Sequence, residues 1–396
     1  MSDKDQSNPG NDIASGEREG FLGKLLGKLG TGTEFTLEGL AKLKSKGRDL
    51  QGPLNGIFGD KLDESGSNLA LPMRLYKYGE GDFSPLEIEK AALKQALPDE
   101  GTSKGDRICI FIHGLASSEK TWLLRRKGER PASYAELLRR DTGHVCYFVR
   151  YNTGRHISLN GRALADLLEA FVKAYPRKIR EINLIGHSMG GLVSRSAGYY
   201  AGEAGHKWLK LLTRNFLLGS PLLGAHQEQI GKLTTDILDL FPATRLTARF
   251  LDMRSSGIQD LGYGYLRDED WNSGDDKSEG AETGGGKPDG AKTGLAGLLT
   301  GGERAPAVVN RRKPVPLIKK VRYFLVLGSV SKDPESIIGS FLGDGVVNRP
   351  SAMGEGSVRK YEQYEDGEIR EIAGLNHVRI PGDPRVYRLL RDWLRD

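Results

Sequence analysis

Residues 181–200 read EINLIGHSMGGLVSRSAGYY, and this stretch decides the fold. The apolar run 182–185 leads into Gly186-His-Ser188-Met-Gly190, and an amphipathic, helix-like segment follows. Where a strand is followed by a sharp turn and then by a helix, the central serine of a G-x-S-x-G pattern lies on the turn. The two glycines remove side chains where the strand and the helix approach closely. The stretch therefore predicts a strand–turn–helix unit that presents Ser188 for chemistry.

The same pattern occurs a second time, at Gly101-Thr-Ser103-Lys-Gly105. The chain has 53 glycines among 396 residues, so the pattern alone is weak evidence of a site. Ser103 lies in a polar stretch that precedes an apolar run and follows none, which predicts a loop serine. The context therefore favours Ser188 as the nucleophile.

Further apolar runs on both sides of this unit indicate a larger sheet. Unbroken apolar runs are typical of strands that are buried on both faces of a parallel sheet. Segments whose apolar residues recur at helical spacing alternate with these runs. The sequence therefore predicts a doubly wound α/β fold. The expected strands are 107–112, 145–151, 182–185, 216–218 and 323–327, and the expected helices are 161–175, 189–200 and 384–394.

The composition excludes several classes of protein. Thirty-eight per cent hydrophobic residues suffice for a buried core, and the net charge of +6 is not clustered as in nucleic-acid-binding proteins. Cys109 and Cys146 are the two cysteines, too few for a disulfide scaffold or a multi-cysteine metal site, and buried free thiols are expected. No apolar run reaches the ~18–20 residues that span a bilayer, and no secretory signal is visible. We expect a soluble, cytoplasmic protein without a nucleic-acid partner.

The chain divides by composition into an N-terminal extension, 1–70, which is expected to be partly disordered, and a main domain, 71–396. A region inserted after the fourth strand, 225–315, lies where a lid is expected. Its segment 272–304 is rich in glycine and has few apolar residues, which predicts a disordered insertion. Its stretch 230–250 is apolar enough for a lid helix or pocket wall, and equally for a helix packed on the sheet.

The N-terminal extension carries an apolar stripe that is interleaved with two lysines. Such a pattern is typical of a basic amphipathic segment on a membrane surface. It is also typical of a helix packed on the protein body, which is the favoured interpretation. The first alternative would make the protein a peripheral membrane protein. The stripe comprises Phe21, Leu22, Leu25, Leu26 and Leu29, with Lys24 and Lys28 between them.

A serine hydroxyl becomes a good nucleophile when a neighbouring base takes its proton. After such a strand–turn–helix unit, the acid and then the histidine follow along the chain. His377 is the one histidine beyond the last predicted strand, which makes it the expected base. The acid should follow the strand 323–327, where Asp333, Glu335 and Asp344 are candidates. Spacing slightly favours Asp344 over Asp333.

Attack by the serine on a carbonyl creates an oxyanion that two backbone N–H groups must stabilise. One is expected from Met189, directly after the serine, and the other from Leu115, in the loop after the strand 107–112. Gly114 precedes Leu115 in that loop, and His113 precedes Gly114. A role for His113 in orienting the loop by hydrogen bonding is favoured over a role as base.

Several separate blocks of the sequence resemble bacterial serine esterases and lipases of the α/β-hydrolase superfamily, and more narrowly the group related to the GPI inositol-deacylases. The similarity covers roughly residues 70–396 and is interrupted by the glycine-rich insertion. The blocks are IFIHGLASSEKTW, RYNTGRHISLNGRALADLLEAF, INLIGHSMGGLVSRSA, LLGSPLLGA, MRSSGIQDLGYGYLRDEDW, FLGDGVVNRPSAMG and GLNHVRIPGDPRVYRLLRDWL.

The resemblance implies hydrolysis of a carboxylic ester or lipid without a metal or organic cofactor. It implies Ser188 as nucleophile, His377 as general base and Asp344 as the acid that orients it. One departure is Gly219-Ser-Pro-Leu-Leu-Gly224, where such proteins often have a histidine after the proline. The resemblance gives a reaction class and no defined substrate. An acyltransferase or a non-catalytic lipid-binding module on the same fold are the alternatives.

Overall fold

The computed structural model of the chain describes residues 51–64, 70–97, 104–124, 130–224, 255–272, 313–331 and 368–395. The strands in these ranges are β1 (Arg74–Gly79), β2 (Asp82–Leu86), β3 (Asp106–Ile112), β4 (Leu123–Leu124), β5 (Ala132–Ser133), β6 (Val145–Arg150), β7 (Ile179–His187), β8 (Leu212–Leu218), β9 (Arg322–Ser329) and β10 (Glu368–Ala373). The α-helices are α3 (Gln51–Glu64), α4 (Lys90–Ala96), α5 (Tyr134–Thr142), α6 (Ile157–Ala174), α7 (Met189–Glu203), α9 (Ser256–Tyr263), α10 (Asp268–Trp271) and α13 (Pro384–Arg395). Short 3₁₀ helices are η1 (Glu119–Trp122), η2 (Lys207–Lys210) and η7 (His377–Gly382).

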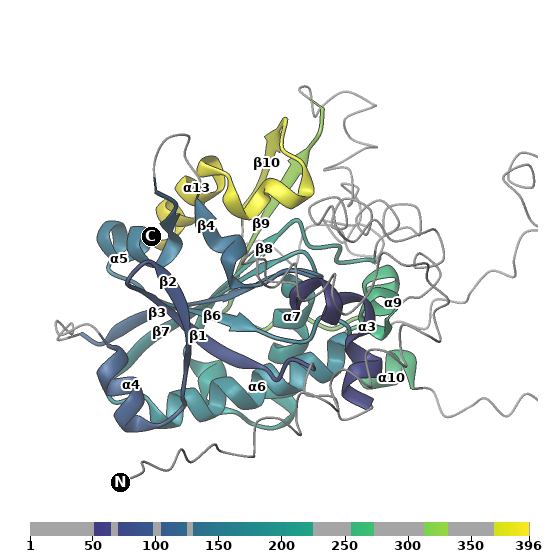
Figure 1. Cartoon of the computed structure of the whole chain (residues 1–396), viewed down its shortest axis with the longest axis horizontal. Coiled ribbons are helices and arrows are strands. Elements are labelled where there is room, and N and C mark those ends of the chain that lie inside the picture. The colour runs from purple at the N-terminus through teal and green to yellow at the C-terminus, as the bar shows by residue number, and fades with distance from the viewer. Residues whose placement is uncertain are drawn as a thin grey trace, which may run out of the picture.

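The central element of the described part of the chain is an eight-stranded sheet in the order β10-β9-β8-β7-β3-β6-β1-β2 (Figure 1). The strands from β10 to β6 pair in parallel. Strand β1 is antiparallel to both of its neighbours, β6 and β2. Strands β4 and β5 pair only with each other.

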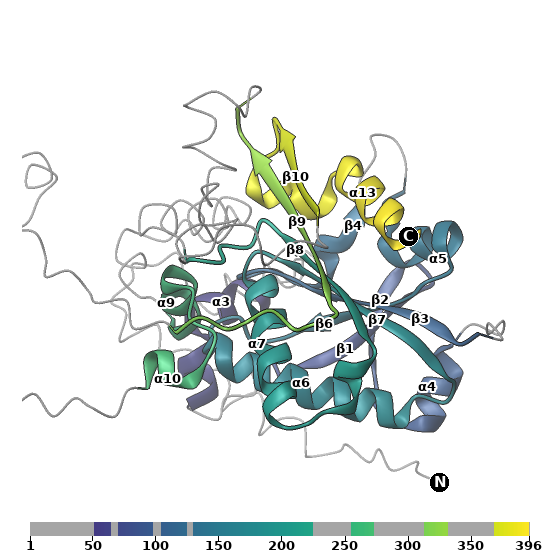
Figure 2. The ribbon, with the colours of Figure 1, turned by 180° about the vertical axis from the view of Figure 1, so that it is seen from behind.

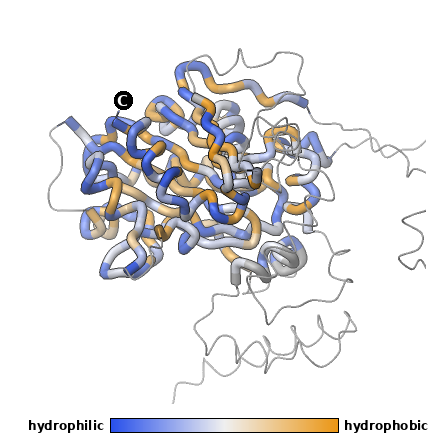
Figure 3. The backbone as a smooth tube through the Cα atoms, turned by 90° about the horizontal axis from the view of Figure 1, so that it is seen from above, coloured by the Kyte–Doolittle hydropathy of each residue, from blue (hydrophilic) through white to orange (hydrophobic). Residues whose placement is uncertain are grey.

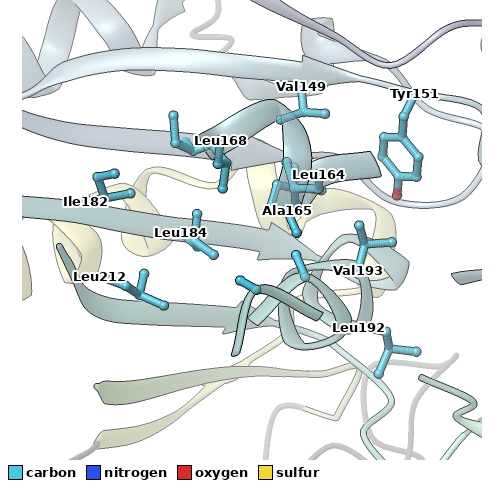
Figure 4. Close-up of a cluster of buried hydrophobic side chains, with 14 of the residues drawn as sticks. Val149, Tyr151, Leu164, Ala165, Leu168, Ile182, Leu184, Leu192, Val193 and Leu212 are labelled. Carbon is cyan, nitrogen blue, oxygen red and sulfur yellow. The ribbon is translucent and has the colours of Figure 1, made fainter. Parts of the chain in front are cut away.

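Helices cover both faces of this sheet, because alternate residues of each central strand point to opposite sides. In β3, Ile108 and Ile110 belong to a buried cluster with α6 and α7, whereas Cys109 and Phe111 belong to a second cluster with α5 and α13. Figure 2 shows α6 and α7 lying across one face. Figure 4 shows part of the first cluster, to which Leu164, Leu168, Leu192 and Val193 of the two helices and Ile182 and Leu184 of β7 belong.

The predicted fold class, a mostly parallel, doubly wound sheet of the α/β-hydrolase type, is confirmed by this topology. The central parallel strands β3, β6, β7, β8 and β9 are buried on both faces, which is why most of their residues form unbroken apolar runs. Figure 3 shows hydrophobic and hydrophilic stretches following one another along the chain. The cysteines face each other across β3 and β6 as buried free thiols, as predicted.

The bounds of several elements differ from the expectation. Strands β7 and β8 begin earlier than the apolar runs predict, at Ile179 and Leu212, because pairing extends through polar residues. Helix α6 begins four residues earlier than expected, at Ile157 instead of residue 161. Strands β1, β2 and β10 were not predicted, because β1 and β2 are mostly half-buried or exposed and β10 is an edge strand with charged residues.

Helix α3 belongs to the segment that the sequence assigns to the N-terminal extension, and it packs on the main domain. Asn55 accepts a hydrogen bond from the Leu71 N–H (3.0 Å), and the Asn152 side chain donates one to the Gly59 carbonyl (2.8 Å). The boundary at residue 70 stays a prediction. The apolar stripe between Phe21 and Leu29, the stretch 230–250 and nearly all of the glycine-rich segment lie outside the described residues.

No helix in the described ranges is both long enough and apolar enough to cross a lipid bilayer.

Candidate active site

The strand–turn–helix unit around Ser188 has a strained backbone at its centre. Strand β7 ends at His187, α7 begins at Met189, and Ser188 between them has φ 53° and ψ −123°. A positive φ at a residue with a side chain is sparsely populated and persists where the surroundings impose it. Here the Ser188 N–H donates to the Leu218 carbonyl of the neighbouring strand (2.9 Å), and the Ser188 carbonyl accepts from the Gly191 N–H (3.0 Å).

Two glycines allow the strand and the helix to come this close. A Cβ on Gly186 would lie 2.5 Å from the Gly191 nitrogen, in the first turn of α7. A Cβ on Gly190 would overlap the carbonyl oxygen of Ile112, at the end of β3. The turn therefore tolerates no side chain at either position.

His377 lies directly beside Ser188, although the two residues are 189 positions apart in the chain. Its Nε2 is 2.9 Å from Ser188 Oγ, and the exposed fractions of the two residues are 1 % and 2 %. His377 begins η7, whose N-cap residue Asn376 accepts a hydrogen bond from the Arg379 N–H (3.1 Å). The distance permits proton transfer between the hydroxyl and the imidazole.

His187 makes a contact to His377 that the sequence does not reveal. Its Nε2 lies 3.1 Å from the His377 backbone carbonyl, and since a carbonyl only accepts, Nε2 carries the proton. Burial, and next the charge of His377, lower the pKa of His187 well below its ordinary value, which keeps the ring neutral. The sequence shows that a histidine precedes the serine, but only the fold shows what its ring contacts.

The loop after β3 lies against the serine. A Cβ on Gly114 would be 3.0 Å from Ser188 Cβ. The Nδ1 of His113 donates to the Gly114 carbonyl (2.9 Å), and its ring stacks on that of Tyr151 at 4.6 Å between centroids. The Tyr151 hydroxyl donates to the His113 carbonyl (2.8 Å). These contacts fit the loop-orienting role that the sequence favours for His113.

The same loop forms a tight turn. The Ser117 N–H donates to the Gly114 carbonyl (3.3 Å), and the Ala116 N–H donates to Thr153 Oγ1 (3.1 Å). Ala116 has φ 54°, a left-handed conformation that favours glycine. Leu115 is the remaining central residue of this turn and is 5 % exposed.

The candidate acids Asp333, Glu335 and Asp344 lie outside the described residues, as does Ser103. Within the described ranges, no three histidine, cysteine or acidic side chains gather as a metal ion would need.

No curated protein matches the chain by sequence. Among solved structures, the mature form of Bacillus licheniformis lipase BlEst2 is 17 % identical, with a TM-score of 0.42 and coverage of 75 % of this chain and 94 % of that one. A lipase-esterase related protein from Clostridium acetobutylicum is 11 % identical, with a TM-score of 0.35 and coverage of 74 % and 96 %. A thermophilic esterase from Thermogutta terrifontis is 14 % identical, with a TM-score of 0.35 and coverage of 74 % and 90 %. Residues 102–247 of this chain, which include Ser188, match the family described as "Putative serine esterase (DUF676)".

Proposed function

We propose that the protein is a serine hydrolase that cleaves carboxylic esters through an acyl-enzyme on Ser188. The observation that carries the proposal is the 2.9 Å contact between His377 Nε2 and Ser188 Oγ on a strained strand–helix turn. The match of residues 102–247 to a serine esterase family supports an ester as the substrate.

The reaction proceeds in two halves. The Ser188 oxygen attacks the ester carbonyl carbon while its proton passes to His377 Nε2. The tetrahedral intermediate collapses, and the alcohol leaves with the proton that His377 held, so the acyl group stays on Ser188. A water molecule then gives its proton to His377 and attacks the acyl carbonyl. The carboxylic acid leaves, and the proton returns to Ser188. No step requires a metal or an organic cofactor.

The oxyanion of each tetrahedral intermediate accepts hydrogen bonds from the N–H groups of Leu115 and Met189. Each such donor is worth about 3–4 kcal/mol of activation free energy. Met189 is the first residue of the 15-residue helix α7, whose N-terminus carries partial positive charge. In the loop, the N–H groups of Ala116 and Ser117 are engaged by Thr153 and Gly114, which supports Leu115 as the donor.

The acid that orients His377 is Asp344, by the resemblance to esterases, and Asp333 is the alternative. A carboxylate at this position holds the imidazole in the correct tautomer and stabilises the imidazolium that forms. A lipid ester is one class of substrate that this reaction can take. A lid formed by 230–250 and membrane contact through the N-terminal stripe would fit such a substrate.

The proposal is tested by hydrolysis of p-nitrophenyl esters of increasing acyl length and by labelling with a fluorophosphonate. We expect Ser188→Ala to lower turnover on the order of 10⁴-fold or more and to abolish labelling, with the folded structure retained by circular dichroism. Ser103→Ala, in the second G-x-S-x-G pattern, is the matched control and should behave as wild type. Full turnover by Ser188→Ala would refute the assignment.

The same esters and the same fluorophosphonate distinguish ester hydrolysis from two alternative functions. A non-catalytic lipid-binding module would neither hydrolyse the esters nor react with the fluorophosphonate. An acyltransferase uses the same nucleophile, so it would label at Ser188 and release p-nitrophenol faster when an acceptor alcohol is added.

A further inference from the structure

We propose that helix α3 is a positioning element of the active site, which holds the loop 113–117 and thereby the proposed oxyanion donor Leu115. The inference rests on the proposed function. Helix α3 precedes the segment that matches the esterase family, 102–247, so nothing in that match assigns it a role.

The backbone of α3 lies directly on the turn of the loop. A Cβ on Gly56 would be 2.6 Å from Ala116 Cβ and 2.9 Å from Ala116 Cα. A Cβ on Gly52, one helical turn earlier, would be 2.7 Å from the Ser117 carbonyl oxygen. Since real Cβ atoms do not approach other atoms this closely, only a glycine face lets the helix reach the loop.

A second segment, 152–154, contacts both α3 and the loop 113–117. The Asn152 side chain donates to the Gly59 carbonyl of α3 (2.8 Å), and a Cβ on Gly154 would overlap the Asn55 carbonyl oxygen of α3. Between Asn152 and Gly154, the Thr153 hydroxyl accepts the Ala116 N–H (3.1 Å). Ala116 is therefore held by α3 through contact and by Thr153 through a hydrogen bond.

The strained conformation of Ala116 explains why this support matters. A residue other than glycine at φ 54° is strained, and the conformation persists only where its surroundings impose it. The loop also lies against the nucleophile, since a Cβ on Gly114 would be 3.0 Å from Ser188 Cβ. A shift of the turn would therefore move the Leu115 N–H relative to the reacting carbonyl.

Helix α3 is itself anchored by residues at the start of α9. The Ser255 hydroxyl donates to the Gly56 carbonyl (2.8 Å), and the Ser256 N–H donates to Asp60 Oδ2 (3.0 Å). Figure 1 shows α3 beside α9, the helix that Ser255 caps. Helix α3 thus contacts both α9 and the loop, which gives it a defined position from which to hold the turn.

The decisive experiment is a double-mutant cycle between the helix and the loop. Gly56→Ala adds one methyl group that meets Ala116, and we expect kcat for p-nitrophenyl butyrate to fall about 10- to 100-fold with KM nearly unchanged. Labelling by the fluorophosphonate should slow by the same factor. Ala116→Gly removes the opposing Cβ and tolerates the positive φ, so the double variant should recover part of the lost kcat, while the 2.9 Å approach to the Cα of residue 116 remains.

Two comparisons keep the test decisive. Gly79→Ala, where a Cβ would meet nothing within 4 Å, should retain wild-type kcat. If Gly56→Ala does not fold, Ser255→Ala replaces it, because it releases the Gly56 carbonyl without steric conflict and should lower kcat about 3-fold. Wild-type kcat in Gly56→Ala, or a loss that Ala116→Gly does not relieve, would overturn the positioning role. A wild-type protein that neither hydrolyses nor labels would instead overturn the proposed function and this inference with it.

Discussion

The imidazole of His187 donates a hydrogen bond from Nε2 to the backbone carbonyl of His377, at 3.1 Å. The residue that precedes the serine therefore holds the residue whose side chain contacts that serine, at 2.9 Å. Two contacts thus connect the turn after β7 with the start of η7. The ring centroids of the two histidines are 5.0 Å apart, so one imidazole supports the placement of the other.

His187→Ala removes the donor to the His377 carbonyl and should lower kcat about 10- to 100-fold through misplacement of the base. His187→Gln keeps an N–H group on a side chain of similar reach and should recover part of that loss. Steady-state kinetics on a p-nitrophenyl ester measure both variants, and the free energy of unfolding is measured in parallel. Equal kcat in His187→Ala and wild type would show that the contact has no positioning role.

Two matched substitutions identify the acid that orients His377. Asp344→Asn should lower kcat on the order of 10⁴-fold, because the histidine loses the carboxylate that holds its tautomer. Asp333→Asn should change kcat by less than about 3-fold, as expected for a carboxylate that does not orient the histidine. The reverse order of effects would assign the role to Asp333.

Two glycines of α7 should respond to alanine in opposite directions. Gly190→Ala places a methyl group on the Ile112 carbonyl and should lower the free energy of unfolding by about 1–3 kcal/mol. At Gly202 a Cβ would meet its nearest neighbour at an ordinary 3.9 Å, so alanine should raise the free energy of unfolding by about 0.5–1 kcal/mol through helix propensity. Urea denaturation measures both. A stabilised Gly190→Ala protein would contradict the packing of α7 against β3.

Stability should fall between pH 7 and pH 5.5 because buried histidines resist protonation. Burial lowers the pKa of His144 below its ordinary value of 6.5, although the neighbouring Glu181 opposes the shift, and His187 is lowered as well. Below pH 6.5 the unfolded chain binds protons that the folded chain does not bind. The free energy of unfolding therefore decreases as pH falls, by up to about 1.4 kcal/mol per pH unit for each histidine.

His144→Gln tests this pH dependence at a position outside the candidate active site. Its free energy of unfolding should decline less steeply between pH 7 and pH 5.5 than that of the wild type. An unchanged slope would mean that His144 is protonated equally in both states. Urea titrations at each pH give the comparison.

Some elements were predictable from the sequence because their signals are local. The apolar run of β7, the two glycines and the amphipathic start of α7 lie within one short stretch, so the strand–turn–helix unit could be recognised there. Helix α5 also has a local signal, the capping box of Ser133 and Glu136, which the apolar pattern alone did not reveal. In α3, Gly52, Gly56 and Gly59 recur at helical spacing and mark the face that packs on the loop and on Asn152, but glycines normally disfavour a helix.

By itself, the sequence determined the class of fold and the candidate nucleophile, because both follow from side-chain periodicity and from the steric limits of one turn. Only the tertiary structure decided which groups surround Ser188. His377 reaches it across 189 residues, His187 turns toward the His377 carbonyl, and α3 packs on the loop after β3. These contacts depend on the order of strands in the sheet and on close packing between elements distant in the chain, which no local pattern encodes.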